Sequence, residues 1–218
     1  MSWTLVVTSH GRWPYLWRMM ETALTPDTFD RAVLSFDGVD LKRNTIAHNY
    51  LKAKGVEVLT TGPERQGLTA NLTQAWGALT PDDEWVFHVE EDFLIGDAPL
   101  DEMRATLEAN RDVAQMALVR QPWSHEEAAA GGMLYGPHLR GELVDEGGWL
   151  RHSRIFTLNP FVAHASLLRS LTPGVESTLT EQCLARGLGF GFWGGMADPP
   201  RVIHIGASGG MGSPGWLP

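Results

Sequence analysis

The first half of the chain alternates short apolar runs, rich in β-branched and aromatic residues, with segments whose apolar positions recur at helical spacing. The apolar runs predict strands over Trp3–Thr8, Arg31–Phe36, Val56–Thr60, Trp85–Val89 and Val113–Val119. Helices are predicted between them, over Trp13–Leu24, Arg43–Ala53 and Gln66–Leu79, and again after Asp97, which we expect to be an N-cap. This alternation is typical of βαβ units around a mainly parallel sheet, so the predicted fold class is α/β with flanking helices.

The second half has a weaker pattern. No period holds over residues 121–150, where pairs of glycines interrupt the chain, and such a segment is usually functional or mobile. Regular elements are predicted again after it, as helices near Ala163–Leu171 and Thr178–Arg186 and a strand over Arg201–Ile205. We expect Thr178 and Glu181 to form a capping box, and the Gly- and Pro-rich residues 206–218 to form a flap or a loose end.

Composition and charge narrow the class of protein. The 218 residues are 43% hydrophobic and 20% charged, which suits one globular domain. A net charge of -9 opposes extended binding to nucleic acid, and Cys183, the single cysteine, excludes an internal disulfide and a thiol pair for zinc. No stretch approaches the roughly 20 apolar residues of a membrane span, and no basic segment precedes an apolar run at the start. We therefore expect a soluble, cytoplasmic protein with no membrane partner.

An acidic triplet is the most informative motif. Glu90, Glu91 and Asp92 directly follow a predicted buried strand, at the end where open α/β sheets bind ligands. Three neighbouring carboxylates repel one another unless a cation is present, and hard oxygen ligands suit Mg²⁺ or Mn²⁺. The alternative is a solvated acidic turn. The apolar residues on both sides of the triplet favour metal or ligand binding.

Four segments, in this order along the chain, resemble GT-A glycosyltransferases, above all the family 2 type. Residues 8–12 (TSHGR) are similar to the first nucleotide-contacting loop, and residues 35–38 (SFDG) look like the second. Residues 65–71 (RQGLTAN) are similar to the G-x-x-x-A-x-N helix start. The acidic triplet occupies the DxD position, with Glu90 in place of the first Asp. The resemblance implies a single GT-A domain, with a nucleotide-sugar-binding half over 1–95 and an acceptor-binding half over 96–205.

The resemblance also implies roles for particular residues. A divalent cation, Mn²⁺ or Mg²⁺, would be held by Asp92 and by a late histidine, His204. Glu176 lies nearest to the position of the catalytic base of inverting members. The donor, which a UDP-sugar fits best by family frequency, would be bound by Thr8, Ser9, Arg12, Asp37, Gly67, Asn71, Glu90 and Glu91.

Several questions stay open at the level of sequence. His204 could equally be a core histidine, and if Glu176 is no base the reaction could be retaining. Trp123 is one of several tryptophans that could stack on a sugar, although packing explains each of them too. The acceptor could be a glycan, a protein, a metabolite or a modified base. The alternatives to glycosyl transfer are a sugar-nucleotide-forming nucleotidyltransferase and a non-catalytic nucleotide- or glycan-binding module. The type resembled is a small bacterial or bacteriophage enzyme.

Overall fold

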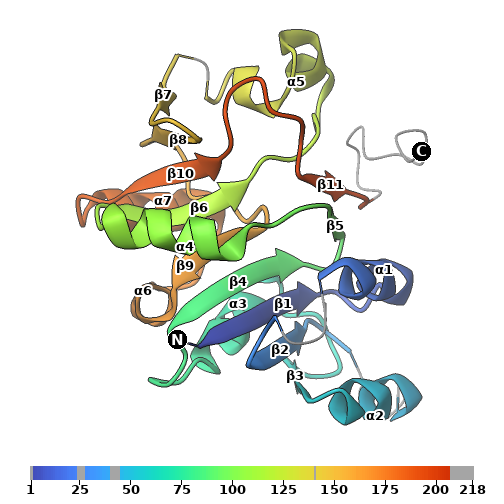
Figure 1. Ribbon diagram of the computed structural model, residues 1–218. Helices are drawn as coiled ribbons and strands as arrows, with labels where there is room; N and C mark the ends of the chain where they lie inside the picture. Colours follow the sequence, from blue (N-terminus) through green and yellow to red (C-terminus); the bar gives the residue numbers. More distant parts are fainter. Residues whose placement is uncertain (1, 24–27, 40–44, 140, 207–218) are drawn as a thin grey trace.

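The computed structural model describes residues 2–23, 28–39, 45–139 and 141–206, with side chains described from residue 48 onward in the third range. Its centre is a nine-stranded sheet (Figure 1). In spatial order the strands are β3 (Val56–Thr60), β2 (Arg31–Phe36), β1 (Trp3–Ser9), β4 (Trp85–Glu90), β9 (Phe161–His164), β6 (Val113–Leu118), β10 (Gly189–Trp193), β8 (Trp149–His152) and β7 (Val144–Asp145). A separate antiparallel pair joins β5 (Phe93–Ile95) to β11 (Val202–His204).

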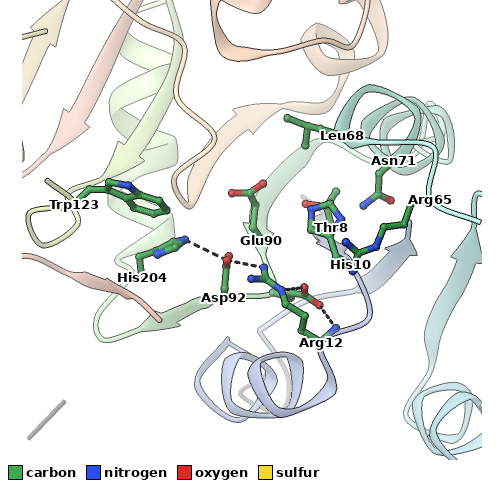
Figure 2. A pocket seen from close by; sticks show the side chains of 11 residues that line it. Thr8, His10, Arg12, Arg65, Leu68, Asn71, Glu90, Asp92, Trp123 and His204 are labelled. Atoms are coloured by element: carbon green, nitrogen blue, oxygen red, sulfur yellow. Dashed lines mark hydrogen bonds and ion pairs between the residues drawn. The ribbon is translucent and has the colours of Figure 1, made fainter. Parts of the chain in front are cut away.

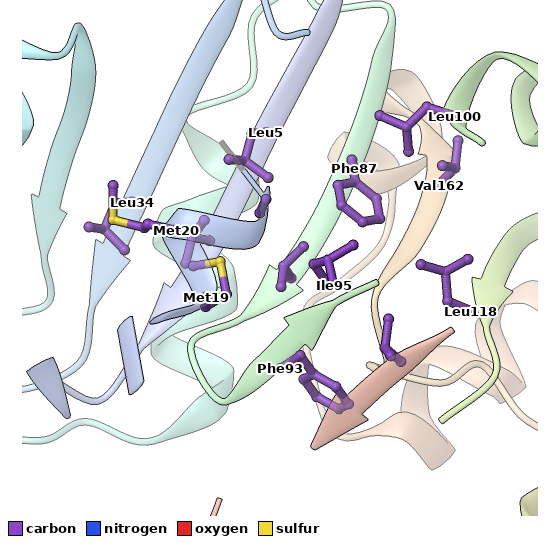
Figure 3. Packing of buried hydrophobic residues seen from close by; sticks show 14 of the residues in the cluster. Leu5, Met19, Met20, Leu34, Phe87, Phe93, Ile95, Leu100, Leu118 and Val162 are labelled. Carbon is purple, nitrogen blue, oxygen red and sulfur yellow. The ribbon is translucent and has the colours of Figure 1, made fainter. Parts of the chain in front are cut away.

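Helices pack on both faces of the large sheet. One face carries α1 (Trp13–Ala23), α2 (Thr45–Ala53) and α4 (Leu100–Ala109), and the other carries α3 (Leu68–Gly77), α6 (Ala165–Ser170) and α7 (Glu176–Leu184). The short α5 (His125–Ala130) and the 3-10 turn η1 (Met133–Tyr135) follow β6. Two apolar layers result because successive strand residues point to opposite faces. In β1, for example, Leu5 and Val7 pack in one layer and Val6 in the other. Figure 3 shows part of the first layer, with Leu5, Phe87 and Val162 on the neighbouring strands β1, β4 and β9.

The α/β fold class predicted from the sequence is confirmed. Parallel pairing holds between β3, β2, β1 and β4, and again between β6 and β10. The register places Thr8 of β1 opposite Glu90 of β4. Strand β9 joins the two parallel groups by pairing antiparallel with both β4 and β6, which makes the sheet mixed. The carboxyl ends of β1, β2 and β4 therefore meet at one edge of the sheet, where the predicted site residues follow.

Most of the predicted elements of the first half form within one to three residues of their expected bounds. Leu24 and Arg43, at the ends of two predicted helices, lie outside the described residues, as does the tail from 207 to 218. Residues 121–150, expected to be irregular, contain α5, η1, β7 and the first part of β8.

Two predicted helix caps are wrong. Helix α4 begins at Leu100 after Pro99, and Asp97 instead pairs with Arg201 at 2.6 Å. Helix α7 begins at Glu176, so Thr178 lies inside the helix and cannot be an N-cap with Glu181. In both cases a tertiary contact competes with the local cap motif. Asp97 pairs with Arg201, and Glu176 accepts a hydrogen bond from the Leu158 amide.

Besides β7 and β8, the strands β9 and β10 of the second half were not predicted. The helix expected from Ala163 begins at Ala165, because Phe161–His164 forms β9 in the middle of the sheet. Strand β10 follows α7 and brings Phe190 and Phe192 into the core. Both runs are too short for a period to separate strand from helix, so pairing with neighbouring strands determines their conformation.

Asp83 is a buried anion on which the N-terminal edge of the sheet depends. Its carboxylate accepts hydrogen bonds from Thr4, from the amide and hydroxyl of Thr80, and from Arg31 Nη1 at 2.6 Å. Burial alone would raise the pKa of Asp83, but these hydrogen bonds and the Arg31 charge outweigh it and lower the pKa. Asp83 therefore contributes stability above the ordinary pKa of an aspartate, and this contribution is lost as pH falls through the depressed value.

Replacing Asp83 by Asn should lower the free energy of unfolding at neutral pH by about 2–3 kcal/mol, because buried donors lose their charged acceptor. The difference from wild type should shrink as the pH falls from about 5 to about 2, where the wild-type carboxylate is protonated. Urea unfolding across this range measures both effects. Asp82→Asn, at an exposed neighbouring position, is the control and should change little. A pH-independent difference would contradict the electrostatic explanation.

Candidate functional site

Three loops meet at the carboxyl edge of the sheet and enclose a first cavity of about 300 Å³. They follow β1, β4 and β6, and strand β11 and the start of α3 complete the wall (Figure 2). The lining residues are Thr8, His10, Arg12, Arg65, Leu68, Asn71, Glu90, Glu91, Asp92, Trp123 and His204. Seven of the residues predicted from the sequence are thus brought together: Thr8, Arg12, Asn71, Glu90, Glu91, Asp92 and His204.

Glu91 fixes the loop between β1 and α1. Its side chain is 1% exposed, and its carboxylate accepts hydrogen bonds from the Ser9 hydroxyl, from Arg12 Nε at 2.6 Å and from the Arg12 amide at 3.1 Å. Ser9 Oγ in turn accepts from the Gly11 amide at 2.9 Å. Glu91 therefore lines the cavity and at the same time fixes the β1–α1 loop, together with Ser9, which is not among the lining residues.

Arg12 places a fixed positive charge in the first cavity. Its Nη2 donates to Asp92 Oδ2 at 2.7 Å while its Nε bonds Glu91, and 32% of the side chain stays exposed. Burial alone would lower the pKa of Arg12, but the hydrogen bonds and charges of Glu91 and Asp92 outweigh it and raise the pKa. The guanidinium is held by two carboxylates and still faces the cavity, where it can meet an anionic ligand.

Asp92 and His204 form a carboxylate–imidazole pair. Asp92 Oδ2 lies 3.2 Å from His204 Nε2, and both residues are more than nine-tenths buried. Burial alone would raise the pKa of Asp92, but the hydrogen bond and charge of His204 and the charge of Arg12 lower it. Gln121 holds the His204 backbone through two hydrogen bonds of 2.8 and 2.9 Å, and the Trp123 ring lies against the imidazole in a tilted arrangement at a centroid distance of 3.9 Å. These contacts fix the orientation of the pair.

Gly206 leaves open the space beside this pair. A Cβ at Gly206 would lie 2.6 Å from His204 Cε1 and would collide with Asp92 Oδ2. Within the described residues, no group of three His, Cys, Asp or Glu side chains is arranged to hold a metal ion. Two protein ligands still fit a divalent cation of the Mg²⁺ or Mn²⁺ class, which often takes its other ligands from water and substrate phosphates. Asp92 and His204 have the oxygen and nitrogen atoms and the open space for such an ion.

Gly206→Ala should therefore reduce Mn²⁺ affinity by about tenfold or more, because the added methyl group occupies the space beside the pair. Disturbing the surroundings of metal ligands typically costs on the order of tenfold to a hundredfold in affinity. Titration with Mn²⁺, followed by electron paramagnetic resonance in the presence of UDP, measures the change. Gly77→Ala is the matched control, since a Cβ at Gly77 meets no atom within 4 Å. Equal affinity in Gly206→Ala and Gly77→Ala would contradict a metal site at Asp92 and His204.

Asp37 holds in place the chain that leads into α3, although it does not itself line the first cavity. Asp37 Oδ1 accepts from the amide of Gln66 at 2.7 Å and from Thr61 Oγ1 at 3.1 Å, and Oδ2 accepts from the Gly67 amide at 3.1 Å. Burial alone would raise the pKa of Asp37, but these hydrogen bonds outweigh it and lower the pKa. Three residues predicted to bind the donor are not among the described residues that line the cavity: Ser9, Asp37 and Gly67. Their hydrogen bonds connect the loops around it.

A second cavity of about 560 Å³ adjoins the first. Glu90, Trp123 and His204 line both cavities, so the two meet at these side chains. Burial raises the pKa of Glu90 to about 8, and the nearby charges of Asp92 and Glu176 add to this effect. Glu176 lines the second cavity from the first turn of α7, and its Oε1 accepts a 2.7 Å hydrogen bond from the Leu158 amide. The Glu176 carboxylate is therefore held in the second cavity, near enough to Glu90 to influence its pKa.

Some lining residues were not assigned to the site from the sequence. His10, Arg65 and Leu68 lie inside the quoted motifs but had no role of their own, and Trp123 was only one of several tryptophans. Their place inside motifs that resemble ligand-binding loops was the signal that could have found these three. Trp123 had no such signal, because it reaches the cavity from the aperiodic segment after β6.

No protein-family model matches the sequence, and none of the curated proteins does. Solved structures do match it. The crystal structure of GalNAc-T7 with UDP, GalNAc and Mn²⁺ has a TM-score of 0.66 at 13% identity, over 94% of this chain and 44% of that chain. The crystal structure of S. aureus TarS 1-349 has a TM-score of 0.59 at 13% identity, over 94% of this chain and 60% of that chain. The chain thus spans about half the length of the structures it matches.

The likeness confirms the GT-A fold that the sequence motifs implied. No helix in the described part of the chain has the length and apolar character needed to cross a membrane.

Proposed function

We propose that the protein is a glycosyltransferase that moves a sugar from a nucleotide-sugar donor, a UDP-sugar, to a hydroxyl of an acceptor. The observation that carries the proposal is the meeting of the two cavities at Glu90, Trp123 and His204. The Asp92–His204 pair faces the first cavity, and Glu176 faces the second. The donor would lie in the first cavity and the acceptor in the second, with the reacting atoms at the junction.

The residues of the first cavity suit a diphosphate. Asp92 and His204 would hold a divalent cation, Mn²⁺ or Mg²⁺, which when bound offsets the negative charge that develops on the departing diphosphate. Arg12 provides a second positive charge that is already fixed in place. The first cavity opens next to Leu68 and Arg65 at the start of α3, where a base and its ribose would lie.

Glu176 suits the role of general base in an inverting reaction. Its position at the start of α7 and its hydrogen bond from the Leu158 amide keep the carboxylate in one place. The acceptor hydroxyl would give its proton to Glu176 as its oxygen forms the bond to the anomeric carbon, while the bond from that carbon to the diphosphate oxygen breaks. The sugar would change its anomeric configuration, because attack comes from the face opposite the leaving group.

The solved structures support the choice of donor and ion. GalNAc-T7, whose fold this chain shares, was crystallised with UDP, GalNAc and Mn²⁺. The same fold and the carboxylate–histidine pair at the strand end favour the same class of donor here.

Hydrolysis of a panel of nucleotide sugars, with Mn²⁺ or with EDTA, tests the proposal without an acceptor, because many transferases slowly transfer to water. We expect Mn²⁺-dependent release of UDP from one UDP-sugar. Release of pyrophosphate on supply of UTP and a sugar phosphate would instead indicate the nucleotidyltransferase. Tight binding of nucleotide or glycan with no turnover, with any acceptor, would indicate the non-catalytic module.

A further inference from the structure

The second cavity is wide and mixes apolar surface with carboxylates. Its volume of about 560 Å³ exceeds that of the first cavity, and its walls come from α5, η1, the loop before β9 and the start of α7. Apolar surface is provided by Met133, Ile155 and Leu158, and Trp123 adds an aromatic side chain at the junction. Such surfaces pack against the C–H faces of a sugar ring.

The one arginine among its lining residues is already neutralised. Arg120 Nη1 and Nη2 donate to the two carboxylate oxygens of Glu127 at 2.8 and 3.0 Å. The guanidinium also lies over the Trp123 ring at 5.5 Å, and only 14% of the side chain is exposed. Glu127 accepts a further hydrogen bond from the Trp123 amide at 2.6 Å. The two charges of this largely buried, bidentate pair cancel, so Arg120 does not attract an anionic ligand.

Besides Arg120 and Glu127, the titratable groups that line the second cavity are the carboxyl groups of Glu90, Glu126 and Glu176 and the imidazoles of His138 and His204. Glu126 is exposed beside the cavity, and no hydrogen bond or ion pair of its carboxylate occurs within the described ranges. Glu176 accepts only the Leu158 amide. No lysine lines the cavity, and its only arginine among the described residues is Arg120. The field in the cavity is therefore negative and opposes entry of an anion.

Asn159 gives an independent indication of the ligand. It lines the cavity and is 7% exposed, and its amide nitrogen meets only the Met133 sulfur, at 3.4 Å. Its amide oxygen accepts no hydrogen bond from any residue that the structure describes, and it is not one of the fully buried polar atoms, so a ligand can reach it. A ligand with N–H or O–H groups would satisfy it.

We infer that the second cavity is the acceptor subsite and that it selects an acceptor carrying a protonated amino group over one carrying a carboxylate, phosphate or sulfate. This inference rests on the proposed function, since it names the acceptor class of the same site. Glu126 supplies the negative charge that attracts the amine, Asn159 accepts a hydrogen bond from the acceptor, and Glu176 stays free to take the proton of the reacting hydroxyl.

Three methyl glycosides of equal size test the inference: methyl glucosaminide, methyl glucoside and methyl glucuronide. Ligand-observed NMR measures their binding to the full chain, and product formation with the active UDP-sugar measures transfer. We expect the amine to bind about tenfold more tightly than the carboxylate, with the neutral sugar between them. Glu126→Gln should reduce this ratio several-fold, while Glu102→Gln, exposed on α4, should leave it unchanged. High salt should weaken the preference.

Each outcome has one meaning. The order amine, neutral, anion, reduced in Glu126→Gln, supports the inference. The inference is overturned by equal binding of the three glycosides, by preference for the glucuronide, or by no binding of any of them. Continued hydrolysis of the UDP-sugar in the same samples then shows that the proposed function survives. Absence of both binding and hydrolysis of every nucleotide sugar rejects the proposed function, and the inference with it.

Discussion

Replacement of Asp92 by Asn is expected to reduce Mn²⁺-dependent release of UDP by about 10³-fold, because a bound cation supplies several kcal/mol of charge stabilisation to the transition state. The substitution keeps the shape of the side chain and removes the negative charge that His204 and Arg12 now face at 3.2 and 2.7 Å. Both the binding of the ion and the orientation of Arg12 and His204 should be affected. Donor hydrolysis with Mn²⁺ measures the loss.

A second measurement separates loss of the ion from loss of the fold. Mn²⁺ binding in the presence of UDP should weaken in Asp92→Asn, whereas the thermal transition should stay cooperative. Asp101→Asn, whose side chain is 77% exposed at the start of α4, serves as the matched control and should behave as wild type. Full activity and unchanged Mn²⁺ affinity in Asp92→Asn would show that the cation, if any, binds elsewhere.

Glu176→Gln is expected to lower the rate of transfer to an acceptor by about 10²–10⁴-fold, the usual contribution of a general base. Binding of the UDP-sugar should not change, because Glu176 lines only the second cavity. The glutamine oxygen can still accept the hydrogen bond from the Leu158 amide, so the start of α7 should stay folded. The loss should therefore appear in kcat for the acceptor reaction and not in the affinity for the donor.

Steady-state kinetics with the best acceptor, together with NMR of the product anomer, provide the test. Glu181→Gln, at an exposed position one turn further along α7, should retain wild-type rates. An inverted product together with the rate loss supports Glu176 as base. A product of retained configuration, with a rate close to wild type in Glu176→Gln, would indicate a front-face reaction in which the donor itself takes the proton.

The nucleotide-binding half was predictable because its signals are local. Strands such as Arg31–Phe36 and Val56–Thr60 form with the predicted bounds, since each is an apolar run between clear breakers. The acidic triplet was placed at a strand end for the same reason. The roles given to its residues stay predictions. All three line the first cavity, but Glu91 is also bonded to the β1–α1 loop, Asp92 is paired with His204, and Glu90 lines the second cavity as well.

The second half depends on long-range contacts that leave little trace in a single sequence. Phe161–His164 becomes a strand because β4 and β6 lie on either side of it. Helix α7 begins at Glu176, whose side chain accepts a hydrogen bond from the distant Leu158 amide. The second cavity could not be predicted at all, since its walls come from several separate segments.

The amino-acid sequence by itself determined the order of the first βαβ units, the GT-A type of fold and the position of the carboxylates at a strand end, because these follow from local periodicity and short motifs. Only the tertiary structure decided which carboxylate is buried as a support, that His204 lies beside Asp92, and that Glu90 and Trp123 join two cavities. Side chains more than a hundred residues apart meet only when the sheet is complete, so the electrostatic environment of the site is a property of the folded chain.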